Sequence, residues 1–254
     1  RAMRARVMPT SLVVAVRTSG TRSPFFFLHG DLSGAGFYCH ALARALGSAW
    51  PFYAVHPHGM DGAEIPDSIE AMARQVVHEV RVARPEGPYF LGGHCNGGFV
   101  AVEAARQLVA AGMEVPLVVV HDATLGVVAE HRRTPQQRAR ASPTNLAERR
   151  PPSEKTAAAD IFLRYRRAIA AYAPGRYAGR IAVLRSEETR DKNADLGWSC
   201  VSSQVEAHVV PGSHHTSITR HVAATGARLR ACLNASAEGI GIASSTISFP
   251  QSRS

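Results

Sequence analysis

The sequence stretch that decides the fold is Tyr89-Phe90-Leu91-Gly92-Gly93-His94-Cys95-Asn96-Gly97-Gly98-Phe99. Within it, a predicted strand passes into a predicted helix through the pattern G-x-C-x-G, with Cys95 at its centre. A nucleophile on such a sharp turn sits in strained backbone, so Gly93 and Gly97 are expected to leave room for close approach of the chain. The helix N-terminus adds positive partial charge, which favours a thiolate and the oxyanion formed when it attacks. We therefore predict that Cys95 is a nucleophile rather than a small apolar residue of the core.

Short apolar runs alternate with helical patterns along the rest of the chain. This alternation is typical of an α/β fold, in which helices cover both faces of a mostly parallel sheet. Seven runs are predicted as strands, at residues 11–17, 24–29, 51–56, 88–92, 116–121, 179–186 and 204–210. Amphipathic spacing predicts one helix that opens near Pro66-Asp67-Ser68, a second over about 96–111 that stops at Gly112, and a third over about 216–233.

One long segment interrupts the alternation between Asp122 and Arg180. Its later part has apolar residues at helical spacing, namely Ile161, Phe162, Tyr165, Ile169 and Tyr172. An insertion of this length inside a compact domain is usually functional. We therefore predict a helical lid over the mouth of a site at about 123–178, within a single domain of residues 1–234. The tail, residues 235–254, is rich in Ser, Gly and Ala and is expected to be disordered or a linker.

A second motif, Phe25-Phe26-Phe27-Leu28-His29-Gly30-Asp31, lies at the end of an earlier predicted strand. In α/β hydrolases, which the strand–turn–helix pattern resembles, the loop after this strand supplies one backbone N–H of the oxyanion hole. The residue after the nucleophile supplies the other. By this resemblance the N–H groups of Asp31 and Asn96 are assigned to the oxyanion hole. The alternative is that His29-Gly30 forms only a turn.

The acid should follow the nucleophile in the chain order nucleophile, acid, histidine. Asp122 comes directly after the predicted strand 116–121. The carboxyl ends of parallel strands are where ligands and catalytic groups converge, so Asp122 is the predicted acid. Asp191 and Asp195 follow a later strand and are second choices, or plain loop carboxylates.

The predicted base lies in Pro211-Gly212-Ser213-His214-His215, between the last strand and the last helix. The Gly-x-His spacing favours His214, and His215 remains a competitor. Four other histidines, His94, His121, His208 and His221, are expected to pack or to be solvated, although His94 and His121 flank the predicted site. His56-Pro57-His58 with Asp61 hints at a metal site, but the string lacks the HxHxDH spacing and no metal is predicted.

Composition limits the function further. The 254 residues are 45% hydrophobic, which is enough for one large core, and no run of about 18 apolar residues predicts a membrane span. The formal net charge of +9 is spread along the chain, with local excess in residues 1–22 and 131–150. This pattern favours a solvated basic face, or a docking surface for an acidic partner, over nucleic-acid binding. Four separated cysteines without a CxxC pair fit a reducing cytoplasm, and a chain that begins with Arg is expected to be processed or part of a longer protein.

From about Ser11 to Leu233 the chain resembles the α/β-hydrolase thioesterases that end non-ribosomal peptide and polyketide synthase lines. The resemblance rests on Phe27-Leu28-His29-Gly30, Tyr38 to Leu46, Gly87-Pro88-Tyr89-Phe90-Leu91-Gly92-Gly93-His94, Asp122, Gly197-Trp198 and Val210-Pro211-Gly212-Ser213-His214. In that family the substrate is an acyl or peptidyl chain on the phosphopantetheine arm of a carrier protein. The lid and the carboxyl edge of the sheet enclose it. The resemblance thus implies a thioesterase that works with an acidic carrier protein and needs no metal or redox cofactor of its own.

Cys95 departs from the family's pattern, because most such enzymes use serine. The rest of the constellation is intact, so we predict an active cysteine variant. Release by hydrolysis, by aminolysis or by ring closure stays open. Two rivals also remain: a cysteine hydrolase of small lactones, similar to dienelactone hydrolases, and a non-catalytic binding module in which Cys95 is unreactive.

Overall fold

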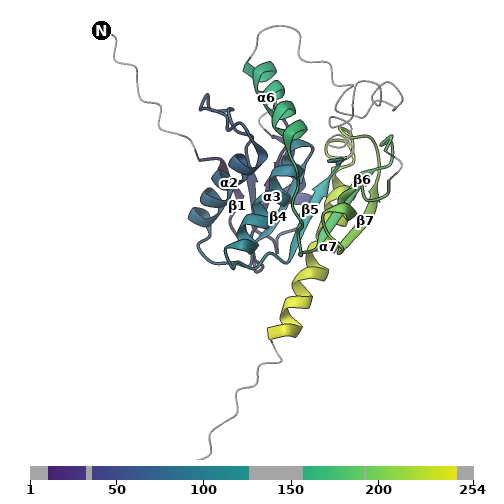
Figure 1. Cartoon of the computed structure of the whole chain (residues 1–254). Coiled ribbons are helices and arrows are strands. Elements are labelled where there is room, and N and C mark those ends of the chain that lie inside the picture. The colour runs from purple at the N-terminus through teal and green to yellow at the C-terminus, as the bar shows by residue number, and fades with distance from the viewer. Residues whose placement is uncertain (1–10, 33–35, 126–156, 192, 245–254) are drawn as a thin grey trace, which may run out of the picture.

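The computed structural model describes residues 11–32, 36–125, 157–191 and 193–244. Its centre is a seven-stranded sheet in the order β1-β3-β2-β4-β5-β6-β7 (Figure 1). β1 pairs antiparallel with β3, and all the other neighbouring strands pair in parallel. The predicted α/β fold with seven mostly parallel strands is therefore confirmed.

The strand bounds lie within two residues of the predicted ones. The strands are β1 Val13–Arg17, β2 Phe25–Leu28, β3 Phe52–Val55, β4 Phe90–His94, β5 Leu117–His121, β6 Ile181–Ser186 and β7 Val205–Val210. Gly93 near the end of β4 pairs with Leu28 of β2 and with Val120 of β5. The carboxyl ends of these three central strands therefore meet at one edge of the sheet.

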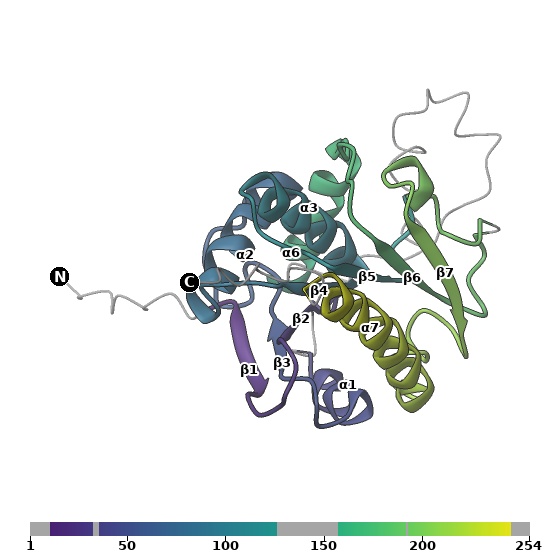
Figure 2. The same cartoon turned by 90° about the horizontal axis from the view of Figure 1, so that it is seen from below.

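Helices cover both faces of the sheet. They are α1 Tyr38–Leu46, α2 Ile69–Ala83, α3 Asn96–Ala110, α6 Ala157–Ala171 and α7 Val222–Ser244, with a short 3-10 helix at Trp198–Cys200. Figure 2 shows α1 and α7 on one face and α2, α3 and α6 on the other. α2 opens where a helix was predicted to begin, and Ser68 caps it, because the Ser68 hydroxyl accepts a hydrogen bond from the Ala71 N–H at 3.2 Å.

The last helix corrects two expectations. It begins at Val222 rather than near Thr216, because the preceding residues form turns in which the Ser217 N–H donates to the Ser213 carbonyl. It also continues to Ser244, so residues 235–244 are helical rather than disordered. Ser236 is buried within this extension, because the helix still faces the molecule there. Residues 245–254 lie outside the described part of the chain.

α6 forms the later part of the segment predicted as a lid. The five apolar residues that gave the helical spacing are all buried: Ile161, Phe162, Tyr165, Ile169 and Tyr172. Residues 126–156, which include most of the predicted lid and of the basic segment 131–150, lie outside the described residues. The part of α6 that is described packs against the body of the domain.

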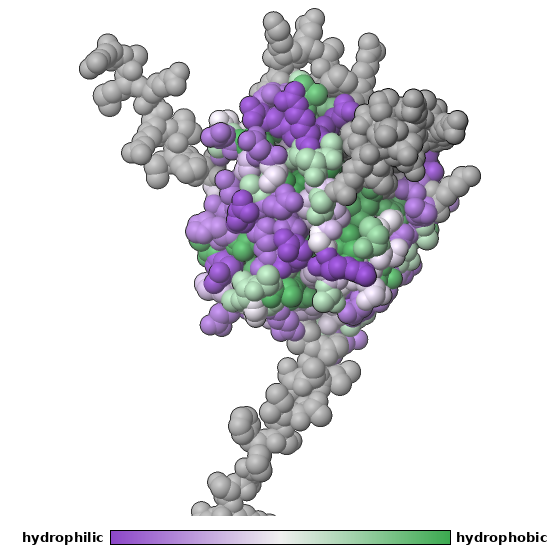
Figure 3. Space-filling model, in the orientation of Figure 1, coloured by the Kyte–Doolittle hydropathy of each residue, from purple (hydrophilic) through white to green (hydrophobic). Residues whose placement is uncertain are grey.

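The face seen in Figure 3 is largely hydrophilic over α2 and α6. On α6 the Arg164 guanidinium lies 3.1 Å from the Asp160 carboxylate, one turn away.

None of the described helices is both long enough and apolar enough to cross a bilayer.

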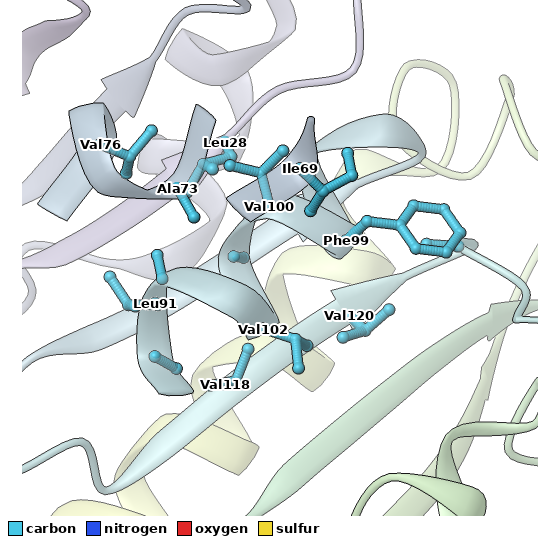
Figure 4. Packing of buried hydrophobic residues seen from close by; sticks show 14 of the residues in the cluster. Leu28, Ile69, Ala73, Val76, Leu91, Phe99, Val100, Val102, Val118 and Val120 are labelled. Atoms are coloured by element: carbon cyan, nitrogen blue, oxygen red, sulfur yellow. The ribbon is translucent and has the colours of Figure 1, made fainter. Parts of the chain in front are cut away.

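The core beside the central strands fixes the position of the turn at Cys95. Figure 4 shows Ile69, Ala73 and Val76 of α2 and Phe99, Val100 and Val102 of α3 packed beside Leu28, Leu91, Val118 and Val120 of the sheet. Each large side chain buried in this way stabilises the fold by about 1.5–3 kcal/mol. Because β4 is buried along its whole length and α3 along most of it, the turn between them has little freedom to move.

Candidate active site

The turn between β4 and α3 holds Cys95 in strained backbone. Cys95 has φ 55° and ψ −122°, a conformation that few residues other than glycine adopt. A Cβ atom on Gly93 would lie 2.3 Å from the backbone of Gly97, and one on Gly97 would lie 2.1 Å from the Leu28 carbonyl oxygen. Both glycines therefore allow the close chain approach that the sequence predicted. Strain of this kind is typical of a turn that presents a nucleophile.

His214 and Asp122 lie together beside this turn. The Nδ1 atom of His214 is 3.6 Å from Oδ2 of Asp122, an ion-pair distance slightly longer than a hydrogen bond. Asp122 also has a positive φ, 47°, directly after β5. Its carboxylate accepts a 2.7 Å hydrogen bond from the Ser186 N–H and a second, short one from the Ser186 hydroxyl. The end of β6 therefore orients the carboxylate toward His214.

The electrostatics of these groups favour a charged histidine. Burial by itself lowers the pKa of His214, but the negative charge of Cys95 and the carboxylate of Asp122 outweigh it and raise that pKa to about 9. Burial raises the pKa of Asp122, but the adjoining His214 and the hydrogen bonds from Ser186 hold it below its ordinary value. The arrangement therefore favours a protonated His214 at neutral pH, with an ionised carboxylate behind it.

The alternative acids form hydrogen bonds elsewhere, and the alternative base is exposed. Asp191 accepts hydrogen bonds from the Thr124 hydroxyl and the Asn193 N–H, and Asp195 accepts from the backbone of residues 197 and 199. His215 is exposed, whereas the side chain of His214 is only 20% exposed. The structure thus brings Cys95, Asp122 and His214 together and leaves the three alternatives outside this group.

The predicted oxyanion loop lies directly against the turn. A Cβ atom on Gly30 would lie 2.5 Å from the His94 carbonyl oxygen and 2.6 Å from Cβ of Cys95. Asp31 follows Gly30 in the chain. Asn96 is the first residue of α3, so the N–H of Asn96 has no partner within the helix. The Tyr38 hydroxyl holds the loop by accepting a hydrogen bond from the Gly30 N–H at 3.3 Å. Of the two residues assigned to the oxyanion hole, Asn96 therefore follows Cys95 directly, and Asp31 follows the glycine that packs against Cys95.

The histidines of the suggested metal string form hydrogen bonds within the protein. Nδ1 of His56 lies 2.7 Å from Nε2 of His29. His58 contacts the hydroxyl of Tyr165 from α6, which accepts a 2.9 Å hydrogen bond from the His58 N–H. Within the described residues, no group of three or more His, Cys, Asp or Glu side chains is placed to hold a metal ion.

Sequence reasoning missed Ser186, which fixes the predicted acid. Ser186 is fully buried at the carboxyl end of β6. Ser186 ends β6, and β6 pairs in parallel with β5, the strand that precedes Asp122. Because neighbouring parallel strands end at the same edge of the sheet, the place of Ser186 at a strand end is the signal that would have pointed to this residue.

The fold is that of an α/β hydrolase. The chain belongs to the thioesterase family, because the family model "Thioesterase domain" matches residues 24–230. It is similar to the NocB thioesterase domain from the nocardicin cluster, with 26% identity and a TM-score of 0.72, covering 89% of this chain and 100% of that one. The Vlm2 thioesterase domain, solved with a bound dodecadepsipeptide, has 21% identity and a TM-score of 0.62 over 87% of this chain and 97% of that one, which shows the shared fold alone.

Curated relatives are large synthetases. Chondramide synthase of Chondromyces crocatus is 38% identical over 112 residues, which are 44% of this chain and 3% of that protein. Malpibaldin synthetase of Mortierella alpina is 35% identical over 115 residues, which are 45% of this chain and 2% of that protein. The chain therefore spans only a small part of the length of these relatives.

Proposed function

We propose that this thioesterase releases an acyl or peptidyl chain from the phosphopantetheine thioester of a carrier protein through an acyl-enzyme on Cys95. The observation that carries the proposal is the strained Cys95 on the β4–α3 turn beside half-buried His214 and buried Asp122. Membership of the thioesterase family and synthetase relatives support the carrier-bound substrate. The net charge of +9 fits an acidic carrier protein as partner, and the four free cysteines fit a reducing cytoplasm.

The first half of the proposed mechanism forms the acyl-enzyme. His214, oriented by Asp122, takes the Cys95 thiol proton and holds the thiolate as an ion pair. The thiolate attacks the carbonyl carbon of the substrate thioester, and the N–H groups of Asp31 and Asn96 stabilise the oxyanion. The carbon–sulfur bond to phosphopantetheine then breaks, and His214 gives its proton to the departing thiolate.

The second half releases the chain. Water, or an amine or hydroxyl of the bound chain, attacks the acyl group on Cys95 while His214 takes the proton of the attacking atom. The bond to Cys95 then breaks, which restores the thiolate and the protonated His214. The product is a free acid, an amide or a ring, according to the attacking group.

A cysteine suits this release step for a chemical reason. Transfer from one thioester to another changes the free energy little, whereas transfer to a serine would give a more stable ester. The acyl group on Cys95 therefore stays a strong acyl donor with a good leaving group. We expect this to favour a weak or constrained nucleophile, as in aminolysis or closure of a strained ring.

Intact-protein mass spectrometry with a panel of acyl-pantetheine thioesters tests the proposal. We expect an acyl adduct and turnover with the parent protein and neither with Cys95→Ala. Exposed Cys200 can exchange with thioesters non-specifically, so Cys200→Ser is the matched control and should keep both adduct and turnover. Absence of adduct and turnover across the panel would contradict the proposal. Activity on free lactones would then favour the lactone hydrolase, and an inert Cys95 the binding module.

Cys95→Ser tests the reason for the cysteine. We expect this variant to accept the acyl group but to release it more slowly, so that the adduct accumulates. The measurement is the ratio of adduct to product during turnover, compared with that of the parent protein. The same product formed at the same rate would rule out this role for the thiol.

A further inference from the structure

β4 and β5 both end on a buried histidine. His94 and His121 are register partners in the parallel pair, and they are 4% and 1% exposed. Their ring centroids lie 4.9 Å apart. Two imidazoles at this depth need hydrogen-bond partners, and the sequence had suggested only packing or solvation for them.

Both side chains reach the turn of residues 213–217, which carries His214. Nε2 of His94 lies 3.0 Å from the backbone carbonyl oxygen of His214, and because a carbonyl only accepts, this nitrogen carries the proton. Nε2 of His121 lies 3.1 Å from the Ser217 hydroxyl at the other end of the turn. The turn closes on itself through a 2.9 Å hydrogen bond from the Ser217 N–H to the Ser213 carbonyl. The two strand ends therefore hold the turn at two points.

The His94 ring also lies against the His214 ring. Their centroids are 4.6 Å apart and the planes are inclined by 30°. The carboxylate of Asp122 is 3.6 Å from His214, so it does not fix the ring by a close hydrogen bond. The backbone anchor and the ring contact supply constraints that the carboxylate alone does not.

We infer that His94 and His121 are positioning residues that hold the 213–217 turn so that the His214 imidazole faces Cys95 and Asp122. The inference rests on the proposed role of His214 as base. The titratable groups that face His214 are Cys95, His94, His121 and Asp122. Burial lowers the pKa of His121 to about 4, so this ring stays neutral beside a charged His214.

The test measures the rate at which iodoacetamide alkylates Cys95 as a function of pH, in the Cys200→Ser background. This rate reports the thiolate–imidazolium pair and needs no knowledge of the substrate. His94→Phe keeps a ring but removes the N–H, and we expect it to slow alkylation at pH 7 by about three- to tenfold, the range for one lost hydrogen bond. His94→Gln keeps an N–H donor and should recover at least half of the parent rate. Exposed His78 gives the matched control, His78→Phe, which should alkylate like the parent.

A merely structural role for His94 would lower the melting temperature while leaving the pH profile of the folded protein unchanged, and that result overturns the inference. If His94→Phe does not unfold cooperatively, the same alkylation measurement on Ser217→Ala tests the inference. This variant removes only the hydroxyl held by His121. A slower alkylation with a shifted profile supports the inference, and a parent-like profile overturns it.

Acylation of the parent by acyl-pantetheine thioesters separates this inference from the proposed function. If the parent is not acylated but its alkylation depends on His94, the thioesterase mechanism fails and the positioning role stands. If the parent is acylated and the His94 variants alkylate normally, only the positioning role fails.

Discussion

At the scale of single residues, the site depends on the negative charge of Asp122 next to the imidazole of His214. Asp122 is buried and ionised because Ser186 donates two hydrogen bonds to it and His214 lies 3.6 Å away. Its charge is one reason why the pKa of His214 rises to about 9. As pH rises through this value, the imidazolium of His214 loses its proton.

Asp122→Asn should therefore change both the rate and its pH dependence. We expect kcat/KM on an acyl-pantetheine thioester to fall by at least about a hundredfold, as when a buried carboxylate behind a catalytic histidine is removed. The alkaline limb of the pH–rate profile, near pH 9 in the parent, should move to lower pH. Asp191→Asn is the matched control and should keep the limb in place. A limb that moves in Asp191→Asn and not in Asp122→Asn would assign the acid to Asp191.

At the scale of elements, the β4–α3 turn has no room for side chains larger than hydrogen at its glycine positions. The strand, the turn and the helix approach the end of β2 so closely that side chains at the glycine positions would overlap backbone atoms. Backbone atoms cannot move aside as the end of a flexible side chain can. The glycines are therefore required by packing, in addition to any role of Cys95.

Gly97→Ala tests this requirement. Its Cβ would lie 2.1 Å from the Leu28 carbonyl oxygen, so we expect a loss of about 3 kcal/mol or more in the free energy of unfolding, the upper end for overpacking. Urea denaturation measures the loss. Gly175→Ala is the matched control, because its nearest neighbour would be Arg106 Cδ at 3.5 Å, an ordinary contact. Equal stability of the two variants would show that the turn can open without cost.

At the scale of the whole molecule, several buried histidines couple stability to pH. Burial, helped in His29 by the neighbouring His56, lowers the pKa values of His29, His58 and His121 from 6.5 to about 4. Between these values the unfolded chain binds more protons than the folded one, so stability falls as pH decreases from 6.5 toward 4. The raised pKa of His214 acts in the opposite sense, because its contribution is complete below 6.5 and is lost as pH rises through about 9.

We therefore expect the melting temperature to be highest near pH 6.5, between the lowered pKa values near 4 and the raised pKa near 9, and to fall steeply toward pH 4. Differential scanning calorimetry over this range measures the fall. His58→Gln can keep a hydrogen bond to Tyr165 without a titrating ring, so it should be less sensitive to acid than the parent, whereas His78→Gln, at an exposed position, should not differ. The same acid sensitivity in His58→Gln as in the parent would contradict a role for this buried ring.

Much of the fold followed from local sequence patterns. The strands were predicted to within two residues, because buried parallel strands are short apolar runs between turn residues. Two helices were less predictable. α1 was not identified as a helix, and α7 begins and ends later than its apolar spacing suggested, because its limits depend on packing against the rest of the molecule.

The sequence by itself determined the strands and the glycine-flanked turn at Cys95, since each depends on neighbours in the chain. The order nucleophile, acid and histidine came from the resemblance to α/β hydrolases and stays a prediction. Only the tertiary structure decided which of two adjacent histidines lies beside Asp122, and that Ser186 orients this carboxylate. It alone showed that His94 meets the backbone of His214, 120 positions away in the chain. These contacts join the ends of different strands, and their formation depends on how the sheet brings those ends to one edge.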